Sequence, residues 1–106
     1  GAVATEMYWK KMDELVAKCE ELEIGLMPSL FWSWAVPDYF DEPYRIAWEN
    51  PESKTRDFME KYTREYVTRY KDSPALYVWE FGNEKVLEAD IFQPQSLPAL
   101  PANSFV

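Results

Sequence analysis

The residues of this chain best suited to chemistry stand near its end, in the run YVWEFGNE from Tyr77 to Glu84. Glu80 and Glu84 are carboxylic acids, and Asn83 directly precedes the second of them. A carboxyl group can donate or accept a proton when its pKa lies near the working pH. The same run also has a purely structural interpretation: glycine and asparagine turn the chain after a strand, and Glu84 stabilises the start of a following helix.

Glu80 stands inside an otherwise apolar run, where a carboxylate is tolerated only if it is paired or neutralised. By strand alternation it shares one face with Leu76 and Val78, and Trp79 and Phe81 share the other. We expect that Glu80 has no strong basic partner within the chain.

Four elements are expected to position these residues, and the first is an amphipathic helix at residues 5–22. Its apolar positions recur at three- and four-residue steps, which is the helical period. They are Tyr8, Met12, Leu15, Val16, Cys19 and Leu22. The run IGLMPSLFW at 24–32 is apolar without alternation, which is typical of a strand covered on both faces. Pro28 weakens that interpretation, because proline cannot donate to a central ladder.

A second helix is predicted at 50–72 and a second strand at 75–81. Asn50, followed by a proline and an acid, is a helix start signal, and Ser53 is a rival N-cap. An apolar stripe at helical spacing indicates helix-to-sheet packing. It consists of Phe58, Met59, Tyr62, Tyr66, Val67 and Tyr70.

The order helix, strand, helix, strand predicts an α/β fold, αβαβ with two parallel strands joined by a right-handed crossover. Long loops follow both strands, an aromatic one at 33–49 and a proline-rich one within 82–106. In parallel α/β folds, binding and chemistry collect after the carboxyl ends of the strands. Both loops are therefore expected on the functional face.

The aromatic loop has two interpretations. Its rings could stack on the apolar faces of sugars, and Trp32 and Trp34, at the strand end, are the candidates for substrate contact. Alternatively, the rings fold the loop upon itself, which we favour for Phe40, Tyr44 and Trp48.

Composition excludes several classes of function. The net charge is -8 with no histidine, which argues against nucleic-acid binding. No cluster with metal-ligand spacing and no apolar run long enough to span a membrane is present, and nothing calls for a cofactor. Cys19, the single cysteine, is expected as a small buried residue. The chain begins with GAVATE, so we expect a start inside a longer protein, with any localisation signal outside these residues.

The run WEFGNE at 79–84 resembles the end of the fourth barrel strand in clan A glycoside hydrolases, especially cellulase and mannanase-like families. The preceding run, SKTRDFMEKYTREYVTRYKDSPALYV, and the earlier PSLFWSW are similar to the same families. The resemblance covers roughly residues 24–90.

The resemblance implies an incomplete (β/α)8 TIM barrel, because a whole barrel takes about 250 residues. It implies that Glu84 is the general acid/base and that Asn83 hydrogen-bonds the sugar 2-hydroxyl. Glu80 would then point into the barrel. Retaining enzymes of this kind need a second carboxylate about 5 to 5.5 Å away, which would follow the seventh strand, outside this chain.

We therefore expect a segment that carries the acid/base, needs the remainder of the barrel to complete its fold, and hydrolyses nothing alone. Its partner would be a β-linked carbohydrate substrate. Two alternatives stay open: a non-catalytic carbohydrate-binding or pseudoenzyme segment, and a small α/β interaction module.

Overall fold

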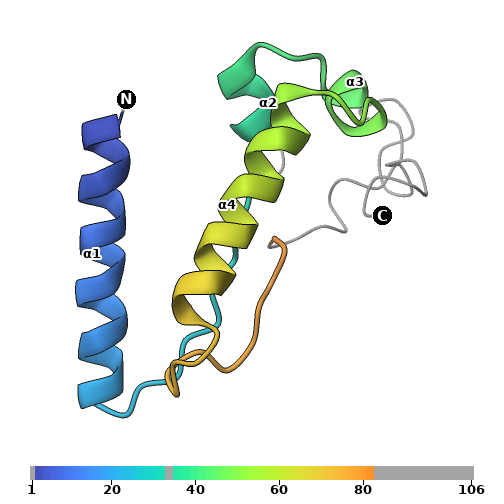
Figure 1. Ribbon diagram of the computed structural model, residues 1–106. Helices are drawn as coiled ribbons and strands as arrows, with labels where there is room; N and C mark the ends of the chain where they lie inside the picture. The colour runs from blue at the N-terminus through green and yellow to red at the C-terminus, as the bar shows by residue number, and fades with distance from the viewer. Residues whose placement is uncertain (1, 33–34, 83–106) are drawn as a thin grey trace.

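A computed structural model describes residues 2–32 and 35–82 of the chain. These residues form four helices: α1 (Ala2–Glu21), α2 (Ala35–Phe40), α3 (Tyr44–Glu49) and α4 (Lys54–Tyr70). Figure 1 shows α4 at the centre, α1 to one side, and the short helices α2 and α3 at the end where α4 begins. Two extended segments, 24–31 and 75–81, run along α4 from its C-terminal end toward its N-terminal end.

Helix α1 lies where an amphipathic helix is predicted, although it begins three residues earlier. Its end is a Schellman motif: Glu23 N–H donates to the carbonyl of Glu20 at 3.2 Å and Ile24 N–H to that of Cys19 at 2.9 Å. Glu23 has a left-handed backbone, with φ of 56°. This closure turns the chain back toward α4 (Figure 1).

Helix α4 begins after Ser53, one of the two predicted N-caps, whose hydroxyl accepts a hydrogen bond from Arg56 N–H at 3.1 Å. The other candidate, Asn50, accepts from Glu52 N–H at 3.0 Å in the preceding turn. Ser53 is buried, and its hydroxyl also donates to the carbonyl of Ala47 at 2.6 Å. The same serine therefore caps α4 and fastens α3 to it.

The core consists of two apolar clusters on either end of α4. The first has the buried side chains Trp9, Val16, Tyr66 and Tyr70. The second has Phe31, Trp48 and Met59. Tyr62 and Leu30 pack against both clusters, so the two are continuous.

Of the predicted stripe on α4, Tyr66 and Tyr70 are buried and Tyr62 is half-buried, and these rings pack on α1 as well as on the extended segments. The Trp9 ring stacks on Tyr62 at 5.7 Å between centroids and contacts Tyr66 at 5.9 Å. Trp79 meets Tyr66 edge-to-face at 5.6 Å. Burial raises the pKa of the Tyr66 phenol to about 12.

The predicted α/β fold with parallel strands at 24–32 and 75–81 is wrong. The described residues contain no sheet, only two isolated parallel bridges, Leu26 to Leu76 and Ser29 to Glu80. An incomplete (β/α)8 barrel of strands and helices is accordingly not what the described residues form. At these two bridges the segments lie side by side in parallel orientation, without forming strands.

The two bridges cannot join into a ladder because their registers differ. The offset is 76 − 26 = 50 residues at the first bridge and 80 − 29 = 51 at the second. Pro28 lies between them and has no N–H to donate. The later segment carries one extra residue at this place, as in a bulge, and both Tyr77 (71% exposed) and Val78 (50%) face solvent.

The predicted strand faces and the aromatic loop also differ from the structure. Leu76 and Trp79, predicted on opposite faces, both pack against the first cluster, because the extra residue breaks the alternation. In the segment predicted as a loop at 33–49, residues 35–40 and 44–49 are the helices α2 and α3. No helix among the described residues meets the length and hydropathy needed to cross a membrane.

Candidate functional site

The ends of the two extended segments are held together by backbone hydrogen bonds. Leu30 N–H donates to the carbonyl of Glu80 at 2.9 Å, and Phe31 N–H to that of Phe81 at 3.0 Å. The Phe31 and Phe81 rings lie 5.5 Å apart. Phe31 and Phe81, the last residues of the two segments, are therefore neighbours. Trp32 follows the first of them in the sequence and Gly82 follows the second.

Trp32, a predicted substrate contact, has 54% of its surface exposed. Its carbonyl accepts a hydrogen bond from Ala35 N–H at 3.0 Å, which fixes the backbone at the start of α2. An exposed indole on a fixed backbone can stack on a flat apolar surface such as a sugar face. The other predicted site residues, Trp34, Asn83 and Glu84, lie outside the described residues.

Glu80 is half-buried and accepts a short hydrogen bond from the hydroxyl of Ser29, across the second bridge. No lysine or arginine among the described residues forms an ion pair with it. The hydroxyl thus supplies the polar partner that a carboxylate in an apolar run requires. Through this hydrogen bond Glu80 links the two segments. In the sequence it stands four residues before Glu84, the predicted acid.

In the short helices α2 and α3, three aromatic side chains pack against other aromatic rings. Trp48 is buried, with Tyr44 at 6.1 Å, and Phe40 packs on Phe58 of α4 at 5.7 Å. These three rings hold the segment on itself and on α4, as favoured from the sequence. Tyr39, by contrast, is 82% exposed.

Sequence reasoning missed Glu42, which organises this region. Its carboxylate accepts from the backbone N–H groups of Lys54 at 2.8 Å and Thr55 at 2.9 Å, and from the Thr55 hydroxyl at 2.7 Å. Asp41, left-handed with φ of 53°, closes α2 and directs Glu42 to this place. The available signal was an acid twelve residues before a helix start, which the sequence alone does not single out.

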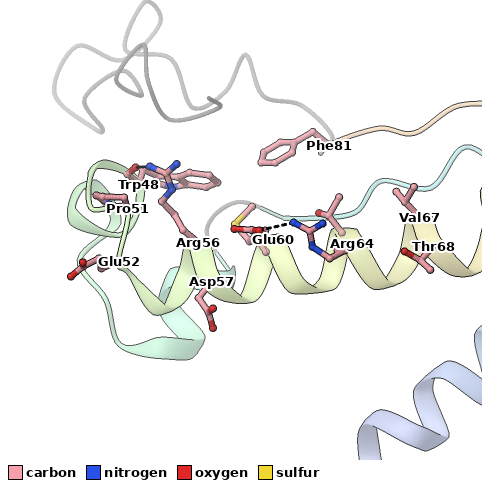
Figure 2. Close-up of a pocket in the computed structure, with 12 residues that line it drawn as sticks. Trp48, Pro51, Glu52, Arg56, Asp57, Glu60, Arg64, Val67, Thr68 and Phe81 are labelled. Carbon is pink, nitrogen blue, oxygen red and sulfur yellow. Dashed lines mark hydrogen bonds and ion pairs between the residues drawn. The ribbon is translucent and has the colours of Figure 1, made fainter.

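A groove of about 1220 Å³ lies along α4 beside Phe81, at the end of the segment 75–81. Figure 2 shows Phe81 on one side of it and Trp48, Arg56 and Glu60 along the other. The acids on α4 in this groove are paired: Glu60 with Arg64 at 2.8 Å and Asp57 with Lys61 at 2.7 Å. Phe81, 38% exposed, lies in this groove near these two ion pairs.

The described residues contain no group of three or more His, Cys, Asp and Glu side chains that could hold a metal ion.

Comparison with known proteins supports a relationship of part of the chain to glycoside hydrolases. The probable mannan endo-1,4-beta-mannosidase F of Aspergillus flavus and that of Aspergillus oryzae are each 31% identical over 83 residues, covering 71% of this chain. The probable mannan endo-1,4-beta-mannosidase C of Aspergillus terreus is 42% identical over 52 residues, or 49% of this chain. The chain spans 17% of the length of the first two and 11% of the third. No family model and no solved structure matches.

Proposed function

We propose that the chain is a segment of a retaining glycoside hydrolase that acts on a β-linked mannan. In this proposal Glu84 is the general acid/base, Asn83 binds the sugar 2-hydroxyl, and Trp32 and Trp34 contact the substrate. The observation that carries the proposal is the partial similarity to mannan endo-1,4-beta-mannosidases.

The arrangement of the described residues supports these roles. The backbone bonds from Leu30 and Phe31 to Glu80 and Phe81 hold the two segment ends together. Exposed Trp32 directly follows one end, and Asn83 and Glu84 follow Gly82 at the other. A sugar-stacking ring and a proton donor must lie close together to act on one substrate, and we propose this for Trp32 and Glu84.

The chemistry requires two carboxyl groups. A glycosidic oxygen leaves poorly until it is protonated, so one carboxylic acid must donate a proton to it. In the retaining mechanism the second carboxylate attacks the sugar and forms a covalent intermediate. We assign the first role to Glu84, and we expect the second carboxylate from polypeptide outside these 106 residues.

The proposal is tested by the dependence of the rate on the leaving group. In the longer polypeptide that contains this segment, Glu84→Ala should lower turnover of mannan by about 10² to 10⁴. Turnover of a dinitrophenyl β-mannoside should fall far less at the glycosylation step, because that leaving group needs no proton. Added azide should then yield a β-mannosyl azide, since the covalent intermediate still forms. Glu88→Ala is the matched control and should leave both rates unchanged.

Two results would contradict the assignment. One is equal loss on both substrates, which would remove Glu84 from the acid role. The other is hydrolysis of mannan by the 106-residue chain alone, which would place both carboxylates within it. If the longer polypeptide binds manno-oligosaccharides and hydrolyses none, the non-catalytic alternative holds; the 54% exposure of Trp32 is the observation in its favour.

A further inference from the structure

Glu80 is attached to the neighbouring extended segment through both its backbone and its side chain. Its N–H donates to the carbonyl of Pro28 at 3.1 Å, and its carbonyl accepts from Leu30 N–H at 2.9 Å. Its carboxylate accepts a hydrogen bond from the hydroxyl of Ser29, the residue that forms the parallel bridge with it. Glu80 is therefore bonded to three consecutive residues of the segment 24–31.

The side-chain hydrogen bond distinguishes this register from the neighbouring one. The offset between the segments is 51 residues at the bridge of Ser29 with Glu80 and 50 at the preceding bridge. If the offset of 50 continued, Ser29 would face Trp79 and Glu80 would face Leu30, so the half-buried carboxylate would lose its hydroxyl donor. Apolar side chains stand at both parities of the two segments, so burial alone does not select a register. The bond between Ser29 and Glu80 therefore favours the observed one.

This register matters for the proposed acid because the chain between them is short. Three peptide bonds join Phe81 to Glu84 in the sequence. Three extended residues span at most about 11 Å, so a displacement of Phe81 is passed on to Glu84. A slip by one residue moves a segment by about 3.3 Å along its neighbour. A misplacement of about 1 Å can already lower a rate by about 10²-fold.

We propose that Ser29 and Glu80 are positioning residues for Glu84. Their hydrogen bond fixes the register in which the end of 75–81 lies on 24–31, and so fixes the point from which the chain continues to the acid. This role rests on the acid/base function proposed for Glu84. Glu80 itself transfers no proton and acts through the backbone that it anchors.

Kinetics of the longer polypeptide on mannan and on the dinitrophenyl β-mannoside test the proposal. Ser29→Ala and Glu80→Ala should each lower turnover of mannan by about 10- to 10²-fold. Turnover of the dinitrophenyl β-mannoside at the glycosylation step should fall far less, because that leaving group needs no proton. The double variant should lose no more than either single variant, because all three lack the same hydrogen bond. A general loss of stability would instead lower both rates alike.

Conservative variants and a matched control isolate the hydrogen bond. Ser29→Thr keeps a hydroxyl donor and Glu80→Gln keeps an oxygen acceptor, so both should retain rates close to those of the wild type. The control is Glu20→Ala. The Glu20 carboxylate accepts from the Ser73 hydroxyl at 2.5 Å, which is the same kind of bond just before the opposite end of 75–81. This variant should leave both rates unchanged.

Glu84→Ala, measured in parallel, separates the positioning role from the proposed function. If Glu84→Ala shows the dependence on the leaving group and the alanine variants of Ser29 and Glu80 do not, the positioning role is wrong and the proposed function stands. If Glu84→Ala itself shows no such dependence, the proposed function fails and the positioning role fails with it. A loss in Glu80→Gln as large as that in Glu80→Ala would also overturn the positioning role, because it would assign the effect to the charge of Glu80.

Discussion

The carboxylate of Glu42 closes the first turn of α4 by accepting hydrogen bonds from both the backbone N–H and the hydroxyl of Thr55, at 2.9 and 2.7 Å. Together with the Ser53 cap, it satisfies N–H groups that the helix itself leaves without partners. Glu42 lies between α2 and α3, so these hydrogen bonds also attach that connection to α4.

Replacing Glu42 with glutamine should lower the thermal midpoint of unfolding in a pH-dependent manner. Burial opposes ionisation, but the hydrogen bonds from Thr55 and Lys54 outweigh it and lower the pKa of Glu42 below its ordinary value of 4.5. A lowered pKa stabilises the fold at pH values above the ordinary one, and that stability is lost as the pH falls through the folded value. The Tm difference between wild type and Glu42→Gln should therefore be full at pH 7 and shrink below about pH 4.5.

Glu52→Gln controls for the loss of one negative charge near the same helix start. Differential scanning calorimetry between pH 7 and pH 3 measures both variants against the wild type. A Tm difference for Glu42→Gln that persists unchanged at pH 3 would show that the charge on this cap is irrelevant.

Replacing Glu23 with glycine should stabilise the chain by about 0.5 to 1 kcal/mol, because the left-handed backbone at this position is costly for a residue with a Cβ atom. Glu23→Ala, which keeps the Cβ, should bring no such gain. Urea unfolding measures both. Equal effects of glycine and alanine would mean that the side chain, and not the backbone, governs this position.

Replacing Tyr70 with phenylalanine should destabilise the contact between α1 and α4 by about 1 kcal/mol. The Tyr70 hydroxyl donates to the Asp13 carboxylate at 2.6 Å from a buried ring. Tyr77→Phe, on a side chain that is 71% exposed, makes the same chemical change with no partner to lose among the described residues. In urea unfolding, a cost for Tyr77→Phe as large as that for Tyr70→Phe would contradict the role of the hydrogen bond.

Replacing Trp32 with alanine should weaken binding of manno-oligosaccharides to the longer polypeptide by about tenfold, the loss of one stacked ring. Tyr39→Ala removes another exposed ring, 82% accessible against 54%, and should bind as the wild type does. Isothermal titration with mannohexaose measures both, and the unfolding midpoints should not change. Unaltered affinity in Trp32→Ala would remove this residue from the substrate site.

The sequence predicts the long helices well because each has a strong period and a recognisable end. Helix α4, predicted at 50–72, lies at Lys54–Tyr70, because Ser53, the rival of Asn50 in the sequence, is its N-cap. Trp9 was missed because α1 carries two apolar stripes. The exposed one, through Tyr8, Leu15 and Leu22, matches the period as well as the buried one, through Trp9, Val16 and Cys19.

The strands were predicted from composition, and composition does not report register. The run 24–31 is apolar and extended, yet Pro28 removes the donor at its middle and the facing segment slips by one residue. The missing donor of Pro28 is visible in the sequence, but the slip depends on which residues lie opposite each other, and a single segment does not encode that. Glu42 was missed for the same reason, because its partner Thr55 is 13 residues away.

Tyr62 and Leu30 touch both apolar clusters, and this has a consequence for how the chain unfolds. Neither cluster can lose its packing without exposing part of the other, so the two ends of α4 should melt together in one transition. Amide exchange near Trp9 and near Trp48 should then report the same opening free energy, although the two residues stand 39 positions apart in the sequence.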